Sequence, residues 1–100
     1  MLGVPARKRK ELLWSRRAAR DLLEIDEYIT REDPAAADRV VRHLLRQSRL
    51  LETDALLGKR RFAGPHRELI LSRYPFSIIY RVAREAVIVV RVLHQRRQFP

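Results

Sequence analysis

The spacing of apolar residues changes once along this chain, at about Gly58. Before Gly58, apolar residues recur every three or four positions, which is the period of an amphipathic helix. After it, they alternate with polar residues or form short unbroken runs, which is typical of strands. A helical half followed by a strand half predicts an α+β fold in which helices cover one face of a sheet.

Two helices are predicted before Gly58. Ser15 is a good N-cap for the first helix, which should end near Thr30. Asp33 caps the second helix and Pro34 occupies its first turn, where proline loses no hydrogen bond. This helix should run for about 22 residues, or ~33 Å, with Gly58 as its C-cap. The short loop between them predicts an antiparallel helical hairpin.

Four strands complete the predicted order β-α-α-β-β-β. One strand, Glu11–Trp14, precedes the helices, and Arg67–Arg73, Phe76–Val82 and Ala86–Leu93 follow them. The last of these is apolar on both sides, which indicates a central strand. We expect the following side chains to pack under the helices: Leu69, Leu71, Phe76, Ile78 and Tyr80.

Charge limits the classes of partner. The 100 residues carry 22 Lys and Arg against 12 Asp and Glu, a net charge of +10, which favours polyanions or an acidic protein. The length indicates one domain, residues 11–100, after a flexible basic tail, residues 1–10. The sequence has no cysteine and no apolar run of membrane-spanning length, so we expect a cytoplasmic protein with no membrane partner. Three scattered histidines without paired carboxylates predict neither a metal site nor a cofactor.

Four segments, in order, resemble the RelE/ParE toxins of type II toxin–antitoxin systems. They are Trp14–Ala18 with the following Asp21-Leu22, then Arg67–Leu69, Ile78–Val82 and Arg91–His94. The resemblance runs from about Leu12 to Phe99. It implies two helices on one face of a four-strand antiparallel sheet, and a toxin held silent by a cognate acidic antitoxin.

Members of this family have one of two activities, RNA cleavage or gyrase binding, and the residues of this chain favour the second. RelE-like members cut messenger RNA in the ribosome, and resemble one another in basic residues where this chain has Ser77, Glu68 and Ile70. Phe99 stands at best for their C-terminal tyrosine and has no proton to give. The segment around His94 is closer to ParE-like members, which bind DNA gyrase and are not nucleases. The alternative is a ribosome-dependent endoribonuclease in which His94 is the acid or base and three arginines are the cations: Arg81, Arg91 and Arg96.

Two binding surfaces are predicted on this basis. The sheet face opposite the helices should be an apolar patch with interleaved arginines, suited to an antitoxin segment. Its residues are Ile70, Ile79, Arg81, Val87, Val89, Arg91 and Leu93. Target binding is assigned to the basic C-terminal third, through Arg73, His94, Arg96 and Arg97.

Overall fold

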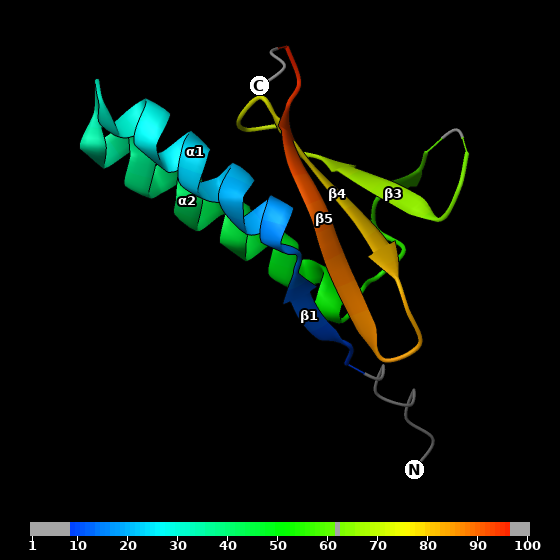
Figure 1. Cartoon of the computed structure of the whole chain (residues 1–100). Coiled ribbons are helices and arrows are strands. Elements are labelled where there is room, and N and C mark those ends of the chain that lie inside the picture. The colour runs from blue at the N-terminus through cyan, green and yellow to red at the C-terminus, as the bar shows by residue number, and fades with distance from the viewer. Residues whose placement is uncertain (1–8, 62, 97–100) are drawn as a thin grey trace.

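The chain forms the predicted order of helices and strands, with one short strand more (Figure 1). The strand predicted at Arg67–Arg73 begins at His66 and ends at Ile70, because residues 71–75 form the turn to the next strand. The computed structural model describes residues 9–61 and 63–96. The predicted flexible tail therefore lies outside the described residues, except for Arg9 and Lys10. Lys10 is held in place, because its Nζ donates to the carbonyl oxygens of Ala83 at 3.0 Å and Arg84 at 2.6 Å. The elements are β1 (Glu11–Trp14), α1 (Arg16–Thr30), α2 (Pro34–Arg49), the 3-10 turn η1 (Leu50–Glu52), β2 (Lys59–Arg60), β3 (His66–Ile70), β4 (Phe76–Val82) and β5 (Ala86–His94).

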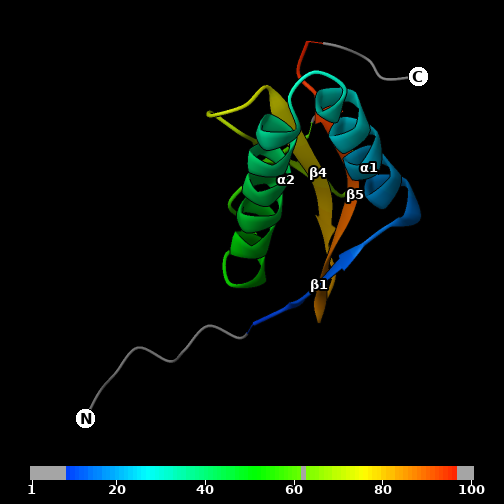
Figure 2. The same cartoon turned by 90° about the vertical axis from the view of Figure 1, so that its left-hand side faces the viewer.

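The strands form one mixed sheet in the order β1-β5-β4-β3-β2. β5, β4, β3 and β2 pair antiparallel, whereas β1 runs parallel to β5. The expectation of an all-antiparallel sheet is therefore wrong at β1. A parallel pair needs a long crossover connection, and the helical hairpin supplies most of it. The α+β class, with both helices on one face, is confirmed, and Figure 2 shows α1 and α2 side by side over β4 and β5.

Both helices begin at the predicted caps. The Ser15 hydroxyl accepts the Ala18 N–H at 3.0 Å, and the Asp33 carboxylate accepts the Ala36 N–H at 3.0 Å. Each bond satisfies a backbone donor that the first helical turn leaves unpaired. Thr30 ends α1 as expected.

The second helix is shorter than predicted. It ends at Arg49 and continues as η1, so Gly58 is not its C-cap. Gly58 instead lies against β4: its N–H donates to the Tyr80 hydroxyl at 2.8 Å, and a Cβ built there would lie 2.8 Å from that oxygen and from the Glu68 carbonyl. The glycine is therefore explained by close approach to the sheet rather than by helix termination.

The core lies between the helices and the inner face of the sheet. From β4 and its preceding turn, the predicted residues Leu71, Phe76, Ile78 and Tyr80 are buried there, and Leu69 packs against them. The helices contribute Ala18, Ile25, Val40 and Leu44.

A bulge in β5 reverses the side-chain alternation of that strand. Ile79 pairs with Arg91, but Tyr80 pairs with Val89, so Val90 has no partner in the register. Val87 and Val89 are both 0% exposed and belong to the core beneath the helices. Their predicted place on the outer face is wrong, because one extra residue shifts the alternation by one position.

Candidate functional site

Asp21 joins the first helix to the last strand. Its side chain is 3% exposed, and its carboxylate accepts from Arg91 Nε at 2.8 Å, Arg91 Nη2 at 3.3 Å and the Val92 N–H at 2.9 Å. Arg17 lies 3.4 Å away, one helical turn earlier. The hydrogen bond to Asp21 is the main cause that raises the pKa of Arg91 above its ordinary value. These contacts fix α1 against β5. They therefore also set the relative position of the C-terminal ends of α1 and β5.

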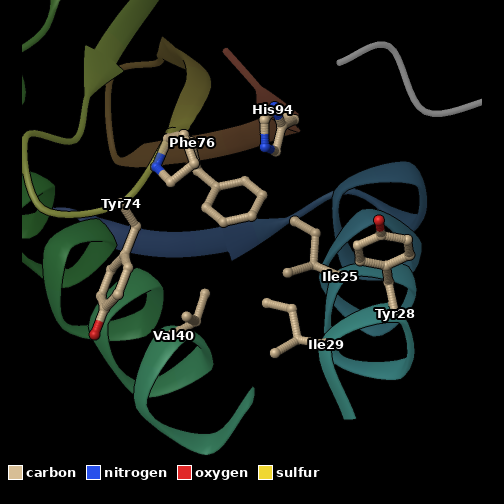
Figure 3. Close-up of a pocket in the computed structure, with 8 residues that line it drawn as sticks. Ile25, Tyr28, Ile29, Val40, Tyr74, Phe76 and His94 are labelled. Carbon is tan, nitrogen blue, oxygen red and sulfur yellow. The ribbon is translucent and has the colours of Figure 1, made fainter. Parts of the chain in front are cut away.

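An apolar pocket of about 190 Å³ lies at the end of the molecule where the helices meet the 71–75 turn. We call it the end pocket. Figure 3 shows side chains from both helices, the turn and the end of β5 around it. Its volume is below the ~300 Å³ usual for small-molecule sites, so an apolar side chain of a protein partner suits it better than a cofactor. The lining residues are Ile25, Tyr28, Ile29, Val40, Tyr74, Pro75, Phe76 and His94.

Cations lie around the end pocket. The Arg73 guanidinium is 5.6 Å from the centre of the Tyr74 ring, and the His43 ring meets the same tyrosine edge-on at 5.1 Å. Burial, then the charges of Arg73 and Arg46, lower the pKa of His43 below its usual 6.5. His43 is therefore neutral at pH 7, and the positive charge at this end comes from the arginines.

Gln95 ties the end of β5 to the 71–75 turn. Its N–H donates to the Pro75 carbonyl at 2.7 Å, and its side-chain amide donates to the carbonyls of Phe76 at 2.8 Å and Leu71 at 3.2 Å. The next residue, Arg96, donates its N–H to His94 Nδ1 at 3.0 Å. These hydrogen bonds hold the 71–75 turn and the end of β5 together, so their exposed residues form one surface.

Three of the four residues assigned to target binding therefore meet at one end: Arg73, His94 and Arg96. We call Arg73 and Arg96, both exposed, the basic rim. Arg97 lies outside the described residues. Sequence reasoning missed the apolar lining, although an aromatic residue followed by proline in the 71–75 turn was an available signal.

The predicted antitoxin face is much less apolar than expected. Val87 and Val89 lie in the core, Ile79 is buried, and Arg91 is engaged by Asp21. Of the predicted set, Ile70 and Arg81 are exposed and Leu93 is half-buried. These three do not make a continuous apolar patch.

Of the alternative nuclease residues, His94 and Arg96 lie side by side, whereas Arg81 and Arg91 do not join them. His94 packs edge-on against Phe76, ring centres 5.2 Å apart, on the helix side of the sheet. Arg81 lies five positions further along β4, ~17 Å away and on the other face by alternation. Arg91 is bound to Asp21. A general acid or base and its cations must reach one phosphate, and this arrangement withholds two of the three predicted cations, Arg81 and Arg91, from His94.

Within the described residues, no group of three or more His, Cys, Asp or Glu side chains could hold a metal ion. No helix in that part of the chain is long and apolar enough to cross a membrane.

Comparison with known families adds the decisive observation. The family model for the ParE toxin of the parDE type II toxin–antitoxin system matches residues 12–99. The chain belongs to this family. The match covers both helices and all of the sheet except Glu11, and agrees with the toxin assignment that the sequence resemblance implied.

Relatives of this ParE-family toxin include two proteins whose names class them as toxins. Y4kP of Sinorhizobium fredii is 37% identical over 92 residues, which cover 92% of this chain and 95% of Y4kP. Toxin RelE3 of Caulobacter vibrioides is 32% identical over 80 residues, covering 78% and 86% of the two chains.

Solved structures agree with the fold. A chain of the chromosomal ParDE system from P. aeruginosa matches with a TM-score of 0.80 and 28% identity, over 87% of this chain and 97% of that one. A chain of the RelBE2 complex from Mycobacterium tuberculosis matches with a TM-score of 0.62 and 20% identity, over 86% and 91%. The second likeness concerns the fold alone.

Proposed function

We propose that this ParE-family toxin acts in the cytoplasm by binding DNA gyrase, and that a cognate acidic antitoxin neutralises it. The observation that carries the proposal is the separation of His94 from Arg81 by the sheet, together with the pairing of Arg91 to Asp21. A binding mechanism needs no acid–base pair aimed at a phosphate.

The end pocket and the basic rim supply the features of a protein-binding site. An apolar pocket receives an anchoring side chain, and exposed cations around it add electrostatic attraction to an acidic surface. Arg73 is held over the Tyr74 ring, and the turn that carries it is fixed by Gln95, so the rim is ordered before binding. Preorganisation of this kind lowers the entropy lost on association.

The test compares gyrase inhibition with messenger-RNA cleavage by the purified, full-length toxin. We expect the toxin to inhibit gyrase supercoiling and to leave transcripts uncut. The double variant Arg73→Glu with Arg96→Glu should weaken inhibition about tenfold or more, because it reverses both charges of the rim. Arg84→Glu is the control for the single variants Arg73→Glu and Arg96→Glu, because it makes the same charge change as each of them in the β4–β5 turn, at the opposite end of the sheet.

Two results would contradict the proposal. The first is equal loss of inhibition in the single rim variants and in Arg84→Glu, which would indicate an effect of net charge alone. The second is discrete cuts in ribosome-bound transcripts without any effect on gyrase, which would establish the endoribonuclease alternative.

A further inference from the structure

Helix α2 carries four exposed arginines on its outermost side, and we call this row the arginine ridge. Its members are Arg39, Arg42, Arg46 and Arg49. With about 3.6 residues per turn, these spacings confine the four side chains to an arc of ~80° over ~15 Å of helix. The buried residues of α2 lie on the opposite side, and they are Ala37, Val40, Leu44 and Ser48. The ridge is therefore the solvent-facing side of α2 and has no part in the core.

Carboxylates neutralise the ridge only in part. Arg42 pairs with Asp38 at 2.9 Å, and Arg49 lies 3.9 Å from Glu52. In the described ranges 9–61 and 63–96, no carboxylate lies within ion-pair distance of the other two members. Neighbouring members are three or four positions apart, so their like charges destabilise the helix. A bound polyanion would relieve this repulsion.

The chemistry of the ridge suits a phosphate backbone better than a protein partner. Guanidinium groups bind phosphate oxygens through two parallel hydrogen bonds. Protein interfaces instead have apolar or aromatic anchors at a centre that is depleted of charge, and the ridge contains only arginines.

The absence of aromatic residues from α2 favours a duplex over a single strand. Single-stranded nucleic acids are bound largely by stacking of their bases on aromatic side chains. Helix α2 contains no Phe, Tyr or Trp, and the ring of His43 meets Tyr74. In a duplex the bases are already stacked, and the phosphates are available to cations alone.

The ridge adjoins the basic rim. Arg46 of the ridge and Arg73 of the rim both lie close enough to His43 for their charges to lower its pKa. A target bound through the end pocket and the rim would therefore lie next to the ridge. Because the proposed target acts on DNA, duplex DNA is the polyanion that the ridge would meet there.

We propose that the arginine ridge of α2 binds the phosphate backbone of duplex DNA without reading its base sequence. Contacts to phosphates give affinity and carry no sequence information directly. The choice of DNA over RNA rests on the proposed function, whereas the preference for a duplex rests on the residues of α2.

The test measures binding of the free, full-length toxin to a fluorescent DNA duplex by anisotropy. Four phosphate contacts contribute about −3.6 to the slope of log association constant against log salt concentration. The double variant Arg39→Gln with Arg46→Gln should reduce the size of this slope by about 1.8 and weaken binding by about tenfold or more. Arg16→Gln with Arg20→Gln is the matched control, because it removes two charges from exposed positions on α1. Circular dichroism of both variants checks that the fold is retained.

A second variant should strengthen binding, which loss of the fold would not do. Asp38→Asn removes the carboxylate that pairs with Arg42, so this guanidinium becomes available to a phosphate. We expect the affinity for the duplex to rise by about twofold or more at low salt. Glu27→Gln is the matched control, because it makes the same charge change at an exposed position on α1.

Two results would overturn the inference. The first is an equal change of affinity in each α2 variant and its control on α1, which would indicate an effect of net charge alone. The second is tighter binding to single-stranded DNA, to an RNA duplex of the same sequence or to polyglutamate, which would give the ridge a different ligand.

These outcomes are independent of the proposed target, because the binding assay contains no gyrase. Loss of the inference leaves inhibition of supercoiling by the toxin unaffected. Binding of the DNA duplex by the ridge without inhibition of gyrase would retain the inference and overturn the target.

Discussion

The carboxylate of Asp21 lies 2.8 Å from Arg91 Nε and binds a residue 70 positions later in the chain. The same carboxylate accepts the Val92 N–H, so it is shared between a side chain and the backbone of β5. This residue therefore holds the helical hairpin to the strand that ends at the end pocket.

Replacing Asp21 should destabilise the fold. Asp21→Ala leaves the Arg91 guanidinium and the Val92 N–H without their acceptor, so the free energy of unfolding should fall by about 2–4 kcal/mol. Asp38→Ala is the control, because it breaks an exposed pair with Arg42 and should cost less than about 0.5 kcal/mol. Urea unfolding measures both, and similar losses in the two variants would show that the Asp21 contacts contribute little.

His94→Gln should leave toxicity largely intact. Glutamine keeps a hydrogen-bonding side chain at the end pocket, so we expect inhibition of gyrase to change by less than about threefold, whereas loss of a catalytic acid or base typically costs ~10²–10⁴-fold. Supercoiling assays and mapping of transcript ends give the two readouts. A hundredfold loss of growth inhibition together with loss of transcript cuts would support catalysis by His94.

The stability of the toxin should depend on pH through His43. Its pKa is lowered in the folded protein by burial, Arg73 and Arg46, so the unfolded chain binds a proton more readily. The stabilisation is complete above the ordinary histidine value of 6.5 and is lost as the pH falls below it. His43→Gln should therefore show a shallower decline in stability than wild type between about pH 7 and pH 5. Identical slopes in urea unfolding at a series of pH values would contradict the assignment.

Tyr80→Phe should loosen the connection before β2. The Tyr80 hydroxyl accepts the Gly58 N–H at 2.8 Å and donates to the Ala55 carbonyl at 2.9 Å. Phenylalanine leaves both backbone groups without that partner, at an expected cost of about 1–3 kcal/mol. Tyr74→Phe is the control, because it keeps the ring that meets His43 and Arg73, and it should change stability by less than about 0.5 kcal/mol. Thermal unfolding checks both, and equal shifts would refute the role of the Tyr80 hydroxyl.

Local signals in the sequence predict the starts of both helices and the position of β1 well. Ser15 and Asp33 are caps whose hydrogen bonds depend on neighbouring residues, so the start of each helix could be read directly. The end of α2 depends on tertiary packing, because Leu51 turns into the core after Arg49. Gly58 does have a structural role, but that role is contact with Tyr80, which lies 22 positions later and could not be read from the neighbouring residues.

The candidate site was less predictable than the fold. Strand 86–93 is apolar on both sides, so its sequence does not show which side chains face the helices. For the same reason the bulge at Val90 could not be predicted from the sequence. Arg91 appeared available in the sequence because its partner Asp21 lies on a distant helix. The basic rim could be predicted, since Arg73 and the residues after β5 were all in the most basic segment.

Side chains at the start of helix α1 satisfy backbone groups of β5 that a neighbouring strand would otherwise bind. Among the residues that the structure describes, no strand pairs with β5 on the β1 side beyond Val89, but the Ser15 hydroxyl donates to the Val90 carbonyl and Asp21 accepts the Val92 N–H. Side chains thus occupy backbone groups that would otherwise attract unrelated chains and promote aggregation. Mutations at Ser15 or Asp21 should for this reason lower solubility during synthesis as well as stability, because they expose these backbone groups of β5.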